Sequence, residues 1–294
     1  MKKLFILLLI PAIGIAQISI TSTPETKELI KVYDSTYNYP GKDVSVLKGQ
    51  NVFVKPKSES LQKFGYDNFV LNPDKSNHVK GNTYKPNSTG YNTEYSNLVG
   101  RYFFVENVLG AETYRPKLKL KDTISNEIIY FQYKRYKHAF PFIVEGFFKK
   151  LETSMLNKKY IIRTLINPIV FLKEEIKVVP GEEKLWEIVK ITIDSKYGNI
   201  SYVLEDDLSH RILVYKDDFE KKALTEKKYN LMKQLYPIYY KKILQEKVVI
   251  GMTELACTVA WGRPKTINTS SSGDQWVYEG SYLYFKDGIL TAFN

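Results

Sequence analysis

A short turn followed by an apolar strand recurs along this chain, and this pattern restricts the fold more than any other feature. Residues 47–54 (LKGQNVFV) match residues 98–105 (LVGRYFFV) position for position, and residues 156–162 (LNKKYII) form a weaker third copy. Each copy places β-branched or aromatic residues directly after a turn, which predicts a short strand. The 23 Tyr and 15 Phe also favour strands over helical bundles.

A second internal similarity predicts two hairpins. Residues 120–131 align without gaps on residues 204–215, an offset of 84 residues (204 minus 120), and the same offset carries Val105 onto Val189. Both segments contain a strand, a turn with Asp, and a second strand, which is the pattern of a hairpin. Identical positions are few, so internal duplication and independent hairpins of similar chemistry both stay open.

The predicted fold is a mainly β front half plus a C-terminal α+β domain. Further strands at 140–144 and 161–166 suggest two or three small antiparallel β modules or barrels. The stretch 72–97 is rich in Asn, Ser, Thr, Lys, Pro and Gly, which predicts a long loop. The expected organisation is a polar N-terminal segment at 17–45, a β module with a long polar loop at 46–97, β modules at 98–150 and 151–218, and an α+β domain at 219–294.

The N-terminus has the three-part pattern of a signal peptide, predicted at 1–16. Lys2 and Lys3 precede the apolar run 4–10, and Gly14 and Ala16 occupy positions −3 and −1 of the expected cleavage site. The apolar run is too short to span a membrane. The only cysteine, Cys257, is far from this site, so we expect an exported protein, periplasmic or secreted, that is not a lipoprotein and has no transmembrane segment after cleavage.

The charge is basic but dispersed. The formal net charge of +11 becomes +9 without Lys2 and Lys3. Most lysines have acidic or apolar neighbours, which is typical of a solvated surface. Export argues against a nucleic-acid partner, and we expect at most weak electrostatic association with a membrane.

Between residues 220 and 245, apolar residues recur near helical spacing among many lysines, which predicts a helix. Thr225 is placed to cap its N-terminus, and Pro237 should end or kink it.

The C-terminal tail begins with a predicted helix. Gly251 supplies a turn, Thr253 the N-cap, and Gly262 a C-terminal position that needs a positive φ, while Pro264 prevents continuation. Leu255, Val259 and Ala260 form its predicted apolar face.

After a polar loop at 268–274, the tail continues as strands. Segments 275–278 and 282–285 are predicted strands, and Asp287-Gly288 makes a hairpin turn into a third. We expect Trp276 and Tyr284 to share a core with Leu255 and Val259.

The segments 250–253, 261–264, 275–278, 283–285 and 288–290 together resemble the SmpA/OmlA (BamE-like) family over about residues 245–294. The resemblance implies a small α+β unit with helices packed on an antiparallel sheet. The best-known members are outer-membrane lipoproteins that support β-barrel assembly; this chain lacks their lipid-bearing cysteine and carries a large β-rich front half. The family has no catalytic group, so the resemblance assigns only structural roles, to Gly251, Thr253, Gly262, Pro264, Trp276 and Gly288.

We find no signature of catalysis or metal binding. His78, His138 and His210 form no zinc-type pair. Ser209 and His210 are adjacent on a turn and should point apart, which disfavours a triad with Asp206. Cys257 lies in mid-helix without a histidine beside it, and we expect it to be buried.

Other reactive motifs are also missing from the sequence. Asp206-Asp207 and Asp217-Asp218 lack the spacing of a calcium loop. There is no Gly-rich phosphate loop. We therefore assign no catalytic residue, no cofactor and no metal ligand.

Three functions compete. The sequence favours a non-catalytic exported protein that acts as a binding or structural module in the cell envelope, with an envelope protein or cell-wall component as partner. The first alternative is a cell-wall or surface carbohydrate binder that uses exposed tyrosines and Trp186. The second is a hydrolase with an unrecognised carboxylate pair, for which a cleft with two carboxylates of perturbed pKa would be the sign.

Overall fold

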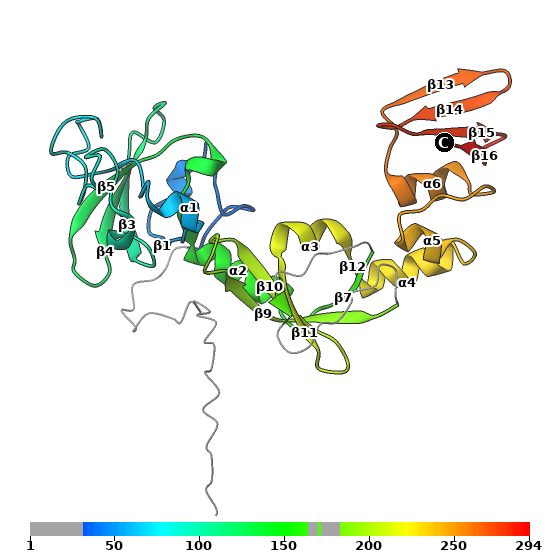
Figure 1. Cartoon of the computed structure of the whole chain (residues 1–294), viewed down its shortest axis with the longest axis horizontal. Helices are drawn as coiled ribbons and strands as arrows, with labels where there is room; N and C mark the ends of the chain where they lie inside the picture. The colour runs from blue at the N-terminus through cyan, green and yellow to red at the C-terminus, as the bar shows by residue number, and fades with distance from the viewer. Residues whose placement is uncertain (1–31, 164–169, 172–182) are drawn as a thin grey trace, which may run out of the picture. The chain divides into compact units, whose positions relative to one another are not determined.

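The structure is a computed structural model that describes residues 32–163, 170–171 and 183–294 (Figure 1). The fold is mostly antiparallel β, with three sheets and an α+β tail, which confirms the predicted fold class. The described residues form two compact units: unit 1 comprises residues up to 146 together with 192–198, and unit 2 comprises 147–191 and 199–294. The predicted signal peptide and residues 164–166 of one predicted strand lie outside the described residues.

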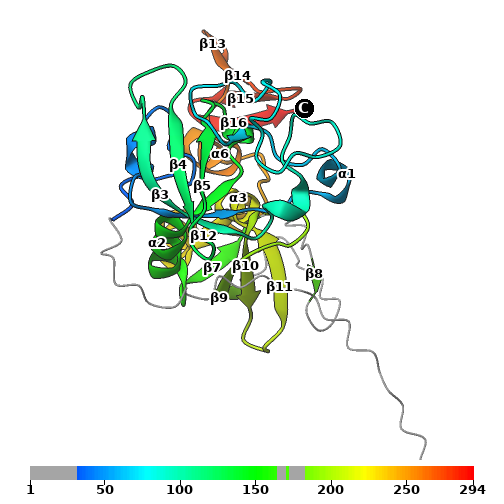
Figure 2. The same ribbon diagram turned by 90° about the vertical axis from the view of Figure 1, so that its left-hand side faces the viewer.

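Unit 1 contains a six-stranded sheet of order β2-β5-β4-β3-β1-β6, and Figure 2 shows β3, β4 and β5 side by side. Because β1 pairs with both β3 and β6, the segments 46–97 and 98–150 contribute to one sheet. The elements are β1 (Asn51–Val54), β2 (Phe69–Val70), β3 (Tyr102–Leu109), β4 (Lys117–Asp122), β5 (Ile128–Gln132), β6 (Phe142–Val144), α1 (Glu59–Gln62) and the 3-10 turns η1 (Val44–Leu47), η2 (Tyr95–Asn97) and η3 (Lys137–Ala139).

The three copies of the turn–strand pattern share one backbone feature. Gly49, Gly100 and Asn157 have φ of 79°, 76° and 59°, and each lies two residues before a strand begins. The left-handed conformation is accessible to Gly and tolerated by Asn, which explains why these residues recur in the pattern.

Aromatic side chains fill the core of unit 1. Phe69, Phe131 and Phe142 are fully buried, and their ring centroids lie 5.0–5.8 Å apart. The long polar loop packs against this core in an ordered path. The buried side chain of Asn82 donates hydrogen bonds to the carbonyls of Asn72, Lys75 and Ser76, at 3.0–3.1 Å. These bonds fix the loop segment 72–76 beside the sheet.

Unit 2 contains a second six-stranded sheet, of order β12-β7-β9-β10-β11-β8. Both predicted hairpins are present, with Leu120 opposite Ile129 in β4–β5 and Leu204 opposite Ile212 in β10–β11. The registers differ by one residue, so the second turn is shorter. The elements are α2 (Glu145–Met155), β7 (Lys159–Ile162), β8 (Val170–Phe171), β9 (Leu185–Ile193), β10 (Ile200–Glu205), β11 (Arg211–Tyr215), α3 (Lys216–Lys222) and β12 (Ala223–Thr225).

The predicted helix over 220–245 is interrupted twice. Residues 223–225 form β12, which pairs with β7 through Leu224 and Ile161. Thr225 then caps α4 (Glu226–Leu235) by accepting a hydrogen bond from the Lys228 amide at 3.3 Å. Pro237 separates α4 from α5 (Tyr240–Leu244), as expected from its missing amide hydrogen.

The tail packs α6 (Glu254–Trp261) on the four-stranded sheet β13-β14-β15-β16 (Figure 1). The predicted polar loop at 268–274 is wrong, because residues 266–270 pair with β14 as an edge strand. The strands are β13 (Thr266–Ser270), β14 (Gly273–Val277), β15 (Tyr282–Lys286) and β16 (Ile289–Phe293).

The predicted tail core is partly wrong. Trp276 is buried, but Leu255 is 63% exposed and Tyr284 is 37% exposed. Side chains alternate along a strand, and in β15 it is Leu283 and Phe285 that face α6. The buried core is therefore formed by Ala256, Cys257 and Ala260 of α6 with Trp276, Leu283, Phe285 and Leu290 of the sheet.

The tail core continues into the sheet of unit 2. Ile161 of β7 belongs to the same buried cluster as Trp276. Arg163 donates from Nη2 to the carbonyl of Val259 in α6, at 3.0 Å. Residue 219, the predicted domain start, therefore lies inside a compact unit.

Candidate functional site

The six residues of the tail motif hold backbone or core positions. Thr253 accepts a hydrogen bond from the Ala256 amide at 3.2 Å and so caps α6. Gly251, Gly262 and Gly288 have φ of 93°, 84° and 76°, and Pro264 lies in the link between α6 and β13. Trp276 is buried in the core. These residues form a scaffold and do not converge on a cavity.

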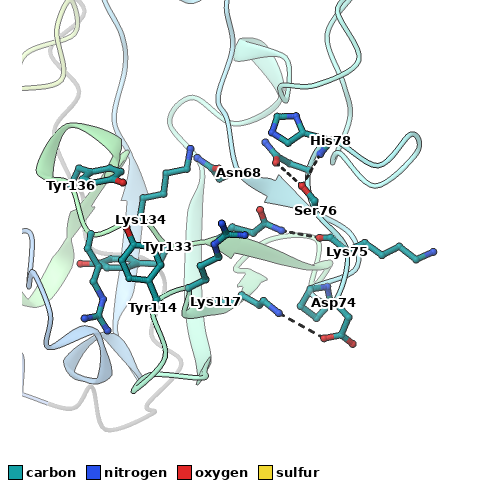
Figure 3. A pocket seen from close by; sticks show the side chains of 15 residues that line it. Asn68, Asp74, Lys75, Ser76, His78, Tyr114, Lys117, Tyr133, Lys134 and Tyr136 are labelled. Atoms are coloured by element: carbon teal, nitrogen blue, oxygen red, sulfur yellow. Dashed lines mark hydrogen bonds and ion pairs between the residues drawn. The ribbon is translucent and has the colours of Figure 1, made fainter.

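A different region, in unit 1, has the features of a binding site (Figure 3). It is a pocket of about 620 Å³, which we call the basic pocket. Three chain segments supply its walls, namely 73–78, 114–117 and 132–136, together with Asn68. This volume lies in the range of small-molecule sites.

The β4–β5 pairing brings these segments together. Lys117, the first residue of β4, is opposite Gln132, the last residue of β5. Residues 114–116 and 133–136 therefore leave the same end of the hairpin, where the Tyr133 amide donates to the Pro116 carbonyl at 2.9 Å. The side chain of Gln132 donates to the Lys75 carbonyl at 2.8 Å, which fixes the third segment.

Two tyrosines give the basic pocket an aromatic wall. Tyr114 is 71% exposed and Tyr136 is 49% exposed. The Tyr136 ring stacks on His138, with centroids 5.6 Å apart and an interplanar angle of 6°. A hydrogen bond with the Tyr114 hydroxyl raises the pKa of Tyr136, so the Tyr136 phenol stays neutral at physiological pH. Exposed tyrosine faces offer a flat apolar contact area at low entropic cost.

Cationic side chains line the rest of the basic pocket. Two of them form long, exposed ion pairs: Lys117 with Asp74 at 3.8 Å and Lys134 with Asp67 at 3.4 Å. The lining cations are Lys75, Arg115, Lys117, Lys134 and Arg135, and Asp74 is the one carboxylate among the lining residues. The pocket therefore favours an anionic or polar ligand.

A smaller cavity of about 280 Å³ in unit 2 gathers carboxylates. Burial raises the pKa of Asp206, but ion pairs with Lys184 and His210 outweigh it and hold that pKa at about 2. The hydroxyls of Tyr229 and Tyr240 and the ammonium of Lys233 lower the pKa of Glu183 to about 2. A glycosidase needs one carboxyl that keeps its proton near neutral pH. Both carboxyls are shifted the other way, which disfavours a general acid here.

The other candidates from the sequence have structural surroundings. His210 Nδ1 lies 2.7 Å from Asp206 Oδ2, and this contact lies within the turn between β10 and β11. Trp186 is buried, so it cannot act as an exposed sugar platform. Burial raises the pKa of the Cys257 thiol to about 12, which keeps it protonated and unreactive. Across the part of the chain that the structure describes, no three or more His, Cys, Asp or Glu side chains are placed to hold a metal ion.

The basic pocket was not predicted from the sequence, because its walls come from three separate segments spread over residues 73–136. A local signal exists in the run Tyr133-Lys134-Arg135-Tyr136, which alternates aromatic and cationic residues, and in Tyr114-Arg115.

Comparison with known proteins adds no assignment, since no protein-family model, curated protein or solved structure matches the chain. The resemblance of the tail to the SmpA/OmlA family therefore stays a prediction. Within the described ranges, none of the helices combines the length and apolar character needed to cross a membrane.

Proposed function

We propose that this chain is an exported, non-catalytic binding module of the cell envelope, and that the basic pocket holds its ligand. The observation that carries the proposal is the joint placement of Tyr114 and Tyr136 with Arg115, Lys117, Lys134 and Arg135 around one recess. The signal-peptide pattern at 1–16 supports an envelope location.

A carbohydrate is the ligand class that suits this recess best. Sugar rings present apolar faces that stack on aromatic side chains, and their hydroxyls bond to polar neighbours such as Asn77 and Gln132. The tail, which resembles the SmpA/OmlA family, then serves as a second folded unit for contact with an envelope protein. A hydrolase remains the less favoured function, because the basic pocket is lined by a single carboxylate, Asp74.

The proposal is tested by capture of envelope polymers. The purified exported chain is incubated with cell-wall and capsule fractions from the producing organism, and bound polymer is quantified. We expect wild-type protein to retain a polysaccharide and Tyr114→Ala/Tyr136→Ala to retain at least about tenfold less, because stacking on two rings is lost. Tyr37→Ala removes an exposed tyrosine outside the basic pocket and serves as the matched control. Equal retention by all three proteins would refute the pocket as the ligand site.

A further inference from the structure

The positive charges that line the basic pocket outnumber the carboxylates beside them. Its two ion pairs, Lys117–Asp74 and Lys134–Asp67, are exposed, and such pairs contribute little and exchange readily for a better partner. Arg115 makes no ion pair with any residue in the ranges 32–163, 170–171 and 183–294. A neutral ligand would leave this charge uncompensated.

The guanidinium of Arg135 is held in place by one hydrogen bond, but its Nε has no hydrogen-bond partner among the described residues. Its Nη2 donates to the Thr113 carbonyl at 2.8 Å, which fixes the side chain. Its Nε is buried and has no hydrogen-bond acceptor within the described part of the chain. Buried donors are normally paired, so the protein leaves the Arg135 guanidinium only partly satisfied. Guanidinium groups bind carboxylate, sulfate and phosphate oxygens especially well.

The shape of the site favours a polymer over a membrane surface as the ligand. Tyr114, Arg115 and Lys134 line a recess, whereas a flat bilayer favours cations that project from a convex face. Figure 3 shows Tyr136, Lys134 and Tyr114 on one side and Asp74, Lys75 and His78 on the other, with Asn68 and Lys117 between the two groups. A flexible chain can enter such a recess and place a ring against a tyrosine while its anionic group reaches a cation.

We propose that the basic pocket binds an acidic polysaccharide, one that carries carboxylate, sulfate or phosphate groups on its sugars. The inference rests on the proposed function, in which the ligand is a carbohydrate. It adds that the ligand must carry negative charge. Arg115 and Arg135 contact the anionic group, Lys117 and Lys134 exchange their carboxylate partners for it, and Tyr114 and Tyr136 contact the ring.

The test compares acidic and neutral polysaccharides on the full exported chain. Polygalacturonate supplies carboxylates, heparin supplies sulfates, a phosphomannan supplies phosphates on sugar rings, and dextran is neutral. Affinity is measured by titration calorimetry at about 0.05 M and about 0.5 M NaCl. We expect at least one acidic polymer to bind at least about tenfold more tightly than dextran at low salt. Screening should weaken that binding at high salt.

Two charge variants localise the effect. Arg115→Gln/Lys134→Gln should lose at least about tenfold in affinity for the acidic polymer, because hydrogen bonds to charged groups are lost. Lys42→Gln/Lys48→Gln removes the same charge from exposed positions of unit 1 outside the basic pocket and should stay within about twofold of wild type. Circular dichroism and thermal melting confirm that each variant is folded.

The outcomes separate the inference from the proposed function. If the first charge variant binds acidic polymers as wild type does, or dextran binds equally well, the inference fails. The proposed function survives that result when Tyr114→Ala/Tyr136→Ala still loses polysaccharide. If neither variant changes binding, both fail. Binding to phosphatidylglycerol vesicles and to no polysaccharide would overturn the inference in favour of a lipid surface.

Discussion

At the scale of single residues, Gly262 holds a backbone conformation that other residues avoid. Its φ of 84° is positive, as expected from the sequence, and together with a ψ of −172° it lies in a region that is nearly exclusive to glycine. A Cβ at this position would meet no atom within 4 Å. Any cost of substitution is therefore backbone strain and not a clash.

We predict that Gly262→Val and Gly262→Asn each destabilise the protein by about 1–3 kcal/mol. Asparagine should give no relief, because it tolerates only the left-handed helical region. Urea unfolding followed by tryptophan fluorescence measures the loss. Gly288→Asn is the control, since Gly288 follows Asp287 in a hairpin turn where Asn is accepted, and should cost less. A harmless Gly262→Asn would contradict this interpretation.

Asp206 is the most strongly engaged carboxylate of the second hairpin. Its Oδ1 accepts hydrogen bonds from the amides of Leu208 and His210, at 3.0 and 2.8 Å. Asp122 occupies the equivalent place in the first hairpin and accepts from the amides of Ile124 and Ser125. Both hairpins thus rely on the same turn chemistry, in which the Asp carboxylate accepts hydrogen bonds from backbone amides of the turn.

We predict that Asp206→Asn lowers stability by more than about 1 kcal/mol at pH 7. The folded pKa of Asp206 is about 2 and its ordinary value is 3.8, so the ionised form stabilises the fold. This contribution is fully present above about pH 4 and is lost as pH falls through about 2. Urea unfolding at pH 7, 4 and 2.5 should show the gap between variant and wild type narrowing. A gap that is constant with pH would contradict the assignment.

At the scale of elements, β15 shows how the alternation of side chains along a strand decides which aromatic residue is buried in the core. Leu283 and Phe285 face α6, while Tyr284 lies on the open face and accepts a hydrogen bond from Gln275 at 3.2 Å. Trp276 lies opposite Leu283 in the neighbouring strand, on the buried face.

We predict that Trp276→Ala destabilises unit 2 by about 3–5 kcal/mol, because a buried ring is lost and a cavity remains. Tyr284→Ala should cost less than about 1 kcal/mol, since its ring is partly solvated. Thermal unfolding by far-UV circular dichroism compares the two. Similar losses would mean that the open face of the sheet is also covered.

Local chemistry explains which elements the sequence predicts correctly. The hairpins around Asp122 and Asp206 and the cap at Thr253 depend on residues within about six positions, so they could be predicted. Strand β12 could not, because it has only three residues and its partner, β7, lies about 60 residues earlier in the chain. Strand β13 could not, because its residues are mostly polar and all exposed, which is the pattern of a loop. The sequence pattern predicts a core position for Tyr284 instead of for its neighbours Leu283 and Phe285. The reason is that apolar and aromatic residues follow one another in this strand, so the buried and exposed positions do not differ in residue type.

The candidate site was less predictable than the fold. Nothing local to Lys75 indicates that its carbonyl meets the Gln132 side chain, 57 residues away. The basic pocket exists only because the end of the β4–β5 hairpin and a loop anchored by Asn82 come together in three dimensions. The sequence shows the aromatic and cationic residue types, but only the register shows that they share a recess.

At the scale of the whole molecule, the tryptophans are unevenly distributed. The chain has three, Trp186, Trp261 and Trp276, and all belong to unit 2. Tryptophan emission therefore reports on unit 2, whereas circular dichroism reports on both units.

We predict that Phe131→Ala, which removes a buried ring in unit 1, lowers the stability of unit 1 by about 3–5 kcal/mol. The circular dichroism transition should broaden or split toward lower urea, and the midpoint of the tryptophan transition should stay unchanged. Trp186→Phe keeps an aromatic ring at a buried position of unit 2 and serves as the control for the fluorescence signal. Equal shifts in both signals would mean that the two units unfold as one.

Unit 1 is not continuous along the chain, because residues 192–198 belong to it although 147–191 belong to unit 2. Within unit 1, Gly198 lies so close to Pro56 that an added Cβ would be 2.6 Å from the Pro56 carbonyl oxygen. A ribosome makes the chain from the N-terminus, so the first 146 residues emerge before the segment that completes their unit. Unit 1 can therefore complete its fold only after about fifty more residues have been made. A chaperone that binds unfolded nascent chains would stay bound to unit 1 during that interval.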